Sequence, residues 1–311
     1  MKKLLMILAA MLLLVGCNST REIDNRNTIK VISPNGIPLV ALGDLMGDEK
    51  VEIENVSGPE LLISALTTKN HDIVIAPLQL GAKLYLSKAS SYQVKAILSF
   101  GNTYIVSREK INSLADLDGQ EIMAYGKNTT PDIILRSALS AKQIETNITY
   151  QNSVDLIIPQ FACSDSCVPP KYILSAEPVM TKLKTKFGID IYTLDLQEVL
   201  KDQIEAIPQA AIFVNPDSQN QKEISDFLDK LKTNTEVLNQ DPKGYAERIV
   251  DKHSYFTDLG VEGLELSIPR SNIKYVDAKQ NQKMIEDYFN LLNQYNENLL
   301  GNKIPDLDFY K

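Results

Sequence analysis

The sequence predicts an α/β protein of two lobes, with a cleft between them and a mainly helical C-terminal part. The first observation is that apolar runs such as residues 71–77 (HDIVIAP) alternate with segments of helix length. Fully apolar strands separated by helices imply a parallel sheet that is covered on both faces. The second is that this alternation restarts near residue 102, and the third is that helical segments dominate from residue 216 onward. Two successive α/β units therefore predict two lobes.

The first unit is an alternation of strands and helices. Its strands are expected at residues 28–33, 51–56, 71–77 and 92–100, and its helices at residues 39–47, 59–69 and 78–87. Proline is favoured in the first turn of a helix, because the N–H group that it lacks would have no partner there. Pro59 therefore marks the start of the second of these helices.

The second unit repeats the pattern with shorter elements. Its strands are expected at residues 102–107, 121–125, 147–150, 171–177, 189–194 and 210–215. A helix is expected over residues 131–140, with Thr129 or Thr130 as its N-cap and Pro131 in its first turn. Further helices are expected from Pro178 and at residues 217–239, 241–252 and 280–300.

The N-terminus has the pattern of a secretory signal. A short basic segment, MKK, precedes an apolar run that is too short for a comfortable membrane span, so residues 1–16 are interpreted as a signal peptide. The run ends in LVGC, which resembles the lipobox of bacterial lipoproteins and predicts that Cys17 is lipidated. Residues 17–28 would then form a polar tether. An ordinary signal peptide with a chance cysteine is the alternative.

Size and charge limit the function classes. About 290 residues remain after the signal. This is more than one hydrophobic core usually organises, so we expect two domains. The chain has 32 basic and 40 acidic residues and a net charge of −8. Nucleic-acid binding needs clusters of Lys and Arg that neutralise phosphates, and the sequence has no such cluster. We therefore expect no nucleic-acid partner.

Two cysteines remain beyond the signal region. Cys163 and Cys167 lie four residues apart in ACSDSC, and a pair this close in an extracytoplasmic protein predicts a disulfide. A zinc site or a redox role is the alternative. Zinc would need further ligands, and the chain contains only two histidines, His71 and His253.

Candidate ligand contacts lie in the turns that follow strands, because ligands of open α/β sheets bind beyond the carboxyl ends of the strands. The candidates are Asn35, Gly36, Ser57, Pro77, Leu78, Asn102, Thr103, Asn128, Thr129, Thr130 and Glu177. Helix capping, ordinary turns, core packing or a surface salt bridge would explain the same residues without a ligand. In the absence of Trp, the candidates for ring stacking are Tyr104, Tyr125 and Phe161, with core packing as the alternative.

Sequence motifs of common enzyme classes are absent. The chain lacks Gly-x-Ser-x-Gly, His-Glu-x-x-His, the P-loop and Gly-x-Gly-x-x-Gly. Two histidines also give little capacity for general base catalysis. The sequence therefore predicts no enzyme activity, no cofactor and no metal, with a lipid-anchored hydrolase as a minor alternative.

Several segments together resemble one protein family. They are residues 105–139 (IVSREKINSLADLDGQEIMAYGKNTTPDIILRSAL), 75–85 (IAPLQLGAKLY), 173–183 (ILSAEPVMTKL), 267–278 (SIPRSNIKYVDA) and 299–310 (LLGNKIPDLDFY). These segments lie between residues 29 and 310, and they follow one another in an order that resembles that of the substrate-binding proteins of ABC importers. The most similar group is the nitrate, sulfonate and taurine type, which includes relatives that bind thiamine pyrimidine precursors. The chain departs from this family at residues 157–170, where the cysteine loop stands.

The resemblance implies the type II periplasmic-binding-protein fold. Residues 29–101 and 214–311 would form the first lobe and residues 102–213 the second, with hinge crossings near residues 100–102 and 213–215. It also implies a monomer that captures a small molecule and delivers it to a membrane permease with an ATPase. The ligand would be a sulfonate- or nitrate-like anion, or a pyrimidine-type heterocycle. A surface adhesin or interaction lipoprotein without a small ligand is the alternative.

Overall fold

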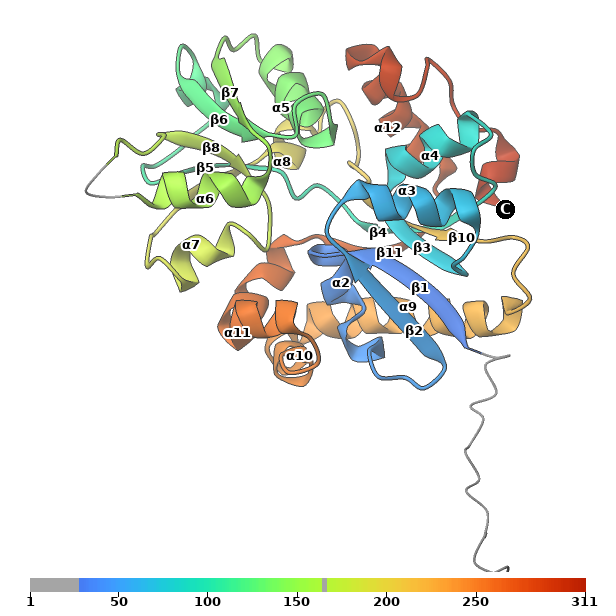
Figure 1. Ribbon diagram of the computed structural model, residues 1–311. Helices are drawn as coiled ribbons and strands as arrows, with labels where there is room; N and C mark the ends of the chain where they lie inside the picture. Colours follow the sequence, from blue (N-terminus) through green and yellow to red (C-terminus); the bar gives the residue numbers. More distant parts are fainter. Residues whose placement is uncertain (1–27, 164–166) are drawn as a thin grey trace, which may run out of the picture.

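The computed structural model describes residues 28–163 and 167–311, which form two lobes that are each built on a mixed β-sheet with helices on both faces (Figure 1). The predicted α/β class with two lobes is therefore confirmed. The predicted signal peptide and Cys17 lie outside the described residues. Within the described part of the chain, no helix has the length and apolar character that a membrane crossing requires.

The first lobe contains a six-stranded sheet in the order β11-β4-β10-β3-β1-β2. Its strands are β1 (Ile29–Pro34), β2 (Val51–Val56), β3 (Ile73–Pro77), β4 (Gln93–Ser99), β10 (Ala210–Val214) and β11 (Ile273–Asp277). The first three strands are parallel, whereas β10 runs antiparallel to both β3 and β4, and β11 runs antiparallel to β4. The expected parallel sheet thus contains two antiparallel strands from the C-terminal half of the chain, β10 between β3 and β4 and β11 at the edge.

Helices cover both faces of this first sheet. They are α2 (Ile37–Ala41), η2 (Gly43–Leu45), α3 (Pro59–Thr68), α4 (Leu78–Leu86), α9 (Gln221–Gln240), α10 (Pro242–Ile249), α11 (Ser254–Ser267), η4 (Ile268–Arg270), α12 (Gln282–Tyr295), η5 (Glu297–Leu299) and η6 (Leu307–Tyr310). One apolar core joins the sheet to α2, α9, α10 and α11, and another joins it to α3, α4 and α12. The C-terminal helices therefore complete the lobe that the N-terminal strands begin.

The second lobe contains a five-stranded sheet in the order β7-β6-β8-β5-β9. Its elements are β5 (Tyr104–Ser107), η3 (Leu114–Leu117), β6 (Glu121–Tyr125), α5 (Thr130–Ala141), β7 (Asn147–Gln151), α6 (Val154–Ala162), β8 (Tyr172–Ser175), α7 (Thr181–Thr185), β9 (Tyr192–Asp195) and α8 (Leu196–Leu200). Strand β6 is parallel to β7 and β8, and β5 is antiparallel to β8 and β9.

Two chain segments join the lobes and lie side by side. The first runs from β4 to β5 through residues 100–103, and the second runs from α8 back to β10 through residues 201–209. Phe100 forms an antiparallel bridge with Pro208, and the Gly101 N–H donates to the carbonyl of Ile207 at 2.9 Å. The two crossings therefore form one paired connection.

The second crossing does not lie where the sequence predicted it. Strand β10 pairs with β3 and β4 of the first sheet, so the chain has already returned to the first lobe at Ala210. The predicted boundary at residue 213 falls inside this strand and is corrected to the segment before residue 210. The sequence placed the first crossing near residues 100–102, and the segment between β4 and β5 covers residues 100–103.

The cysteine pair closes a loop at the end of α6. Cys163 and Cys167 are joined by a disulfide, as the sequence predicted, with their Cα atoms 6.1 Å apart. The guanidinium of Arg108 donates to the carbonyls of Phe161 and Cys163, and it also lies over the Phe161 ring. Arg108 thus satisfies carbonyl groups at the helix C-terminus, where a cation is favourable.

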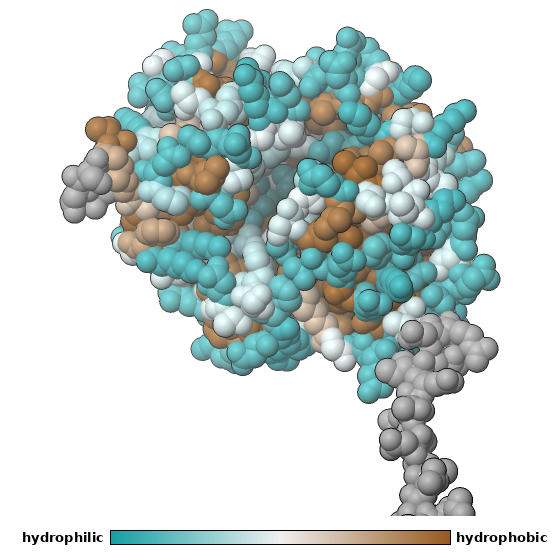
Figure 2. All heavy atoms as spheres, viewed as in Figure 1, coloured by the Kyte–Doolittle hydropathy of each residue, from teal (hydrophilic) through white to brown (hydrophobic). Residues whose placement is uncertain are grey.

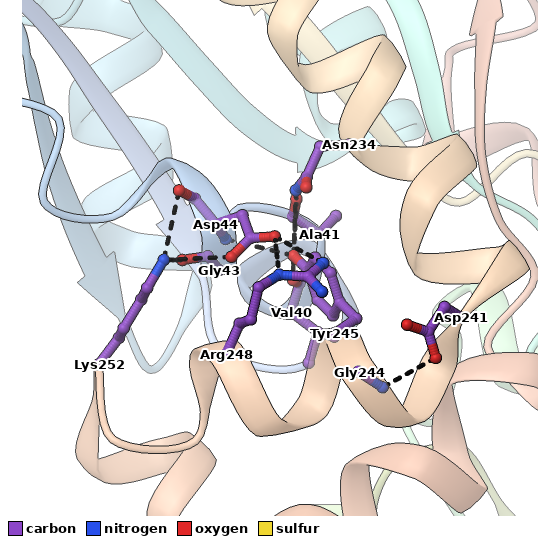
Figure 3. A network of polar contacts seen from close by, with 10 residues as sticks. All are labelled: Val40, Ala41, Gly43, Asp44, Asn234, Asp241, Gly244, Tyr245, Arg248 and Lys252. Carbon is purple, nitrogen blue, oxygen red and sulfur yellow. Dashed lines mark hydrogen bonds and ion pairs between the residues drawn. The ribbon is translucent and has the colours of Figure 1, made fainter.

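A polar network fixes the short helix α2 in the first lobe (Figure 3). The Tyr245 hydroxyl donates to the Val40 carbonyl at 2.7 Å, and the Asn234 amide donates to the Ala41 carbonyl at 2.7 Å. These bonds satisfy carbonyl groups at the end of α2 that would otherwise have no partner inside the helix. The start of the same helix faces the space between the lobes, so the network holds that start in place.

Candidate functional site

A cavity of about 750 Å³ lies between the two lobes. Figure 2 shows the molecule hollowed between them in this view. The wall combines residues of the first lobe with residues of the second, and many of them follow strand ends, as the sequence predicted. A volume of this size is typical of sites that bind small molecules.

The structure places most of the predicted ligand contacts at this wall. They are Asn35, Gly36, Ser57, Pro77, Asn102, Thr129, Thr130 and Glu177. Three other candidates do not contribute to it. Leu78 is fully buried in the core, Thr103 accepts a hydrogen bond from Gln209, and the Asn128 N–H donates to Asp132.

Backbone geometry brings the first-lobe turns to the cavity. Gly36 links β1 to α2 with a φ of 99°, a value in the left-handed region that favours glycine. Gly58 separates β2 from α3 in a similar way, with a φ of 151°. Each strand therefore turns sharply at the cavity, and the next helix begins there.

In the second lobe, the turn before α5 is held by its own hydrogen bonds. Thr129 is the N-cap residue, but its hydroxyl donates to the Gly126 carbonyl at 2.6 Å instead of capping the helix. The carboxylate Oδ2 of Asp132, in the first turn of α5, accepts the Asn128 N–H at 2.8 Å and so fixes the turn that precedes the helix. Thr130 accepts a 3.4 Å hydrogen bond from the hydroxyl of Tyr288, which belongs to the first lobe. The two threonines are thus partly committed to the fold.

Glu177 is buried where the two lobes meet. Its Oε2 accepts hydrogen bonds from the backbone and the hydroxyl of Thr181, at 3.2 and 2.7 Å. Its Oε1 lies 3.6 Å from the Arg270 guanidinium of the first lobe. Burial raises the pKa of Glu177 to about 7, against the lowering effect of Thr181 and Arg270. The side chain has no exposed area, so Glu177 acts first as a contact between the lobes.

Aromatic rings from both lobes face the cavity. Of the rings predicted from the sequence, Tyr125 lines the wall, whereas Tyr104 and Phe161 are buried in the core of the second lobe. Tyr255 of α11 was not predicted, and it also lines the wall. Burial raises the pKa of Tyr125 and of Tyr255, and for Tyr255 the Asp155 carboxylate adds to the effect. Both hydroxyls therefore remain protonated.

A chain of hydrogen bonds runs from α11 to the cavity wall. The Tyr255 N–H donates to Nδ1 of His253, so the ring proton is on Nε2, which donates to the Asn55 amide oxygen at 3.1 Å. Asn55 donates to the Asn35 amide oxygen at 2.9 Å, and Asn35 donates to the Ser57 hydroxyl oxygen at 2.7 Å. Because the Ser57 hydroxyl oxygen accepts the hydrogen bond from Asn35, the Ser57 hydroxyl proton points away from Asn35. Ser57 lines the cavity, so this hydroxyl can donate to a ligand.

Ion pairs connect the lobes beside the cavity. Asp258 of α11 pairs with Lys182 at 3.1 Å and with Lys186 at 2.5 Å, and both lysines belong to the second lobe. The Tyr104 hydroxyl also donates across the lobes, to the Arg270 carbonyl at 2.6 Å. The described residues contain no cluster of His, Cys, Asp or Glu side chains suited to a metal ion.

Comparisons with known proteins agree with this architecture. No protein family and no curated protein matches the sequence. An ABC transporter protein from Parabacteroides distasonis is similar in structure, with a TM-score of 0.77 and 22% identity over 92% of this chain and 99% of that one. The periplasmic aliphatic sulphonate binding protein SsuA from Escherichia coli matches with a TM-score of 0.65 and 11% identity, over 91% of each chain.

A third similar structure is the ligand binding component of an ABC-type import system from Staphylococcus aureus, with zinc bound. Its TM-score is 0.61 and its identity 16%, over 90% of this chain and 100% of that one. At these identities the likeness concerns the fold. The chain has the two-lobed α/β fold of the binding proteins of ABC importers.

Proposed function

We propose that the chain is the solute-binding component of an ABC importer, a binding protein rather than an enzyme. The observation that carries the proposal is the cavity of about 750 Å³ whose wall combines both lobes and which lies beside a paired connection. A ligand that touches both lobes favours the closed arrangement, because it binds that arrangement more tightly than an open one. The similar folds of importer binding proteins support the same role.

The proposal includes a place and partners. The protein is a monomer anchored by a lipid on Cys17 at the extracytoplasmic face of the membrane, with residues 17–28 as its tether. A membrane permease and its ATPase receive the ligand. The ligand is a small molecule, either a sulfonate- or nitrate-like anion or a pyrimidine-type heterocycle. A surface adhesin or interaction lipoprotein without a small ligand is the competing function.

Thermal unfolding of the full chain in detergent micelles tests the role. The panel consists of sulfonates, nitrate, bicarbonate, amino acids and pyrimidine heterocycles. A ligand that binds only the folded state raises the melting temperature in a dose-dependent way. We expect such a shift from one chemical class, and no shift across the panel would favour the adhesin.

Two variants localise the binding. Ser57→Ala and Tyr125→Phe each remove one hydroxyl from the wall, one in each lobe, and both should reduce the ligand-induced shift. The matched controls are Ser140→Ala and Tyr295→Phe, which alter exposed residues outside the wall. Equal shifts in the wall variants and the controls would place the ligand elsewhere.

A further inference from the structure

The basic side chains near the cavity are already paired. Among the described residues of the wall, the one basic side chain is Lys182, and its Nζ lies 3.1 Å from a carboxylate oxygen of Asp258. Asp258 also binds Lys186. Recruiting Lys182 to an anionic ligand would cost this contact between the lobes.

The arginines of the second lobe are also committed elsewhere. Arg108 donates to carbonyls at the end of α6, and Arg136 pairs with Asp132 at 2.9 Å and donates to the Tyr150 hydroxyl. Neither arginine belongs to the cavity wall. A bidentate guanidinium, which is the group best suited to a sulfonate or a carboxylate, is therefore missing from the described wall.

The helix starts at the cavity carry prolines. Pro38, Pro59 and Pro131 stand in the first turns of α2, α3 and α5, and all three line the wall. Anion binding at a helix N-terminus depends on free backbone N–H groups that point at the ligand. Proline has none, so each of these helix starts has lost a donor and presents an apolar ring.

Acidic residues occupy the first turns of α3, α5 and α6, three of the helices that begin at the wall, whereas α4, which also begins there, has none. In α3 the acid is Glu60, whose carboxylate lies beside the N-cap residue Gly58. A Cβ atom added to Gly58 would be only 2.8 Å from Oε2 of Glu60. In α5 the acid is Asp132, whose carboxylate accepts the Asn128 N–H. In α6 it is Asp155, which itself lines the cavity. These carboxylates offset the positive ends of the helix dipoles.

The remaining wall suits an uncharged or cationic partner. The hydroxyls of Ser57, Tyr125 and Tyr255 are protonated and can donate to a carbonyl or a ring nitrogen. The carboxylate of Asp155 can accept from an amine or amidine. Prolines and aliphatic side chains supply apolar contact for the body of the ligand.

We propose that the ligand carries no net negative charge and is a neutral or cationic molecule with an apolar body, hydrogen-bond acceptors for the wall hydroxyls and a donor for Asp155. This inference rests on the proposed function and selects among its ligand classes. It favours an amino-substituted heterocycle over a sulfonate, although sulfonate-binding proteins share the fold.

The test compares probes of one shape and different charge. Benzenesulfonate, benzamide and benzamidine share a ring and differ in the charge of one substituent, and 4-aminopyrimidine adds a heterocycle. Each is titrated against the full chain in detergent micelles while thermal unfolding is followed. We expect benzamide, benzamidine and 4-aminopyrimidine to raise the melting temperature by about 2–4 °C at ten times their Kd, and benzenesulfonate to leave it unchanged.

A variant pair examines the carboxylate. Asp155→Asn should weaken benzamidine binding about twofold to fivefold, the range of an exposed ion pair, and leave benzamide binding unchanged. The matched control is Glu198→Gln, which removes an exposed first-turn acid from α8, outside the wall. Equal effects of the two variants on benzamidine would overturn the role of Asp155.

The outcomes separate this inference from the function on which it rests. Binding of benzenesulfonate that exceeds that of benzamide and benzamidine would overturn the ligand class and uphold a solute-binding protein. The absence of a shift with all four probes would overturn the ligand class, whereas the solute-binding role falls only if the broader panel also gives no shift. Binding of the neutral and cationic probes, with the expected loss in Asp155→Asn, would support both.

Discussion

Replacing Asn102 with Ala is expected to destabilise the protein by about 3–7 kcal/mol. Asn102 lies in the first crossing with a φ of 58°, and Ala in this left-handed region costs about 1 kcal/mol or more. Its side chain also bonds both backbone groups of Glu177. The Asn102 amide donates to the carbonyl at 3.1 Å, and its oxygen accepts the N–H at 2.7 Å.

The magnitude follows from burial. Both residues are buried, so Ala would leave a buried donor and a buried acceptor of Glu177 without partners. Each such loss costs about 1–3 kcal/mol. Asn102→Gly loses the same two bonds but tolerates the left-handed backbone, so it should be about 1 kcal/mol less destabilising than Asn102→Ala.

Equilibrium unfolding in urea at 25 °C measures these differences. Asn302 provides the matched control, because it has a φ of 56° but is exposed and its amide bonds an exposed carboxylate. Asn302→Ala should cost about 1 kcal/mol, which is the backbone cost alone. If Asn102→Ala cost no more than Asn302→Ala, the two buried hydrogen bonds would contribute nothing and the reasoning would be refuted.

Three further predictions concern packing, pH and lobe contacts. Gly81→Ala would place a Cβ 2.1 Å from the buried Phe213 ring and should lower the free energy of unfolding by about 1–3 kcal/mol. Gly263→Ala, whose Cβ would have its nearest neighbour at 3.5 Å, should raise the free energy of unfolding by about 0.5–1 kcal/mol. Urea unfolding measures both variants. Because burial raises the pKa of Glu177 to about 7, the native state holds a proton that the unfolded state loses above its ordinary pKa of 4.5. Stability should therefore fall by up to about 1.4 kcal/mol per pH unit between these values, and urea unfolding of Glu177→Gln should lack this contribution. Asp258→Asn removes two ion pairs between the lobes, so it should speed ligand release in stopped-flow experiments while changing stability by less than about 2 kcal/mol.

Each of these predictions has an opposing result. Equal destabilisation by the two glycine variants would mean that the Phe213 ring moves aside freely. A stability that rises between pH 5 and 7 more steeply in the wild type than in Glu177→Gln would reverse the assigned sign. Unchanged release from Asp258→Asn would show that its two ion pairs do not hold the lobes together.

Strands whose side chains are buried on both faces were the easiest to predict from the sequence. Strand β3 is wholly apolar from Ile73 to Ala76, and such a run is visible without any tertiary information. Strand β11 was not predicted, since only Ile273 of its five residues is fully buried and its pattern is not apolar. The position of β10 was misjudged for another reason. A run such as AAIFV shows that a strand is buried, but not which sheet it joins.

The cavity was predictable only in part. Turns at strand ends are local features, so Asn35, Ser57 and Thr129 could be found from the sequence. Tyr255 lies far away in the chain and reaches the wall through the packing of α11, which no local pattern reveals. The resemblance left an anion and a heterocycle open as ligands. Which helix starts meet at the wall, and that acids and prolines gather there, depends on the tertiary structure.

The pairing of the two crossings limits how the lobes can move. The Gly101 N–H binds the Ile207 carbonyl, and the Gln209 N–H binds the Ser99 carbonyl at 2.9 Å. Rotating one lobe about the length of this ribbon would pull these partners apart, whereas bending the ribbon keeps them together. If the lobes open and close as the proposed function requires, bending of this ribbon is the motion that keeps both hydrogen bonds. A ligand that closes the cavity would then restrict little more than this bending, so more of its contact energy would be left for affinity.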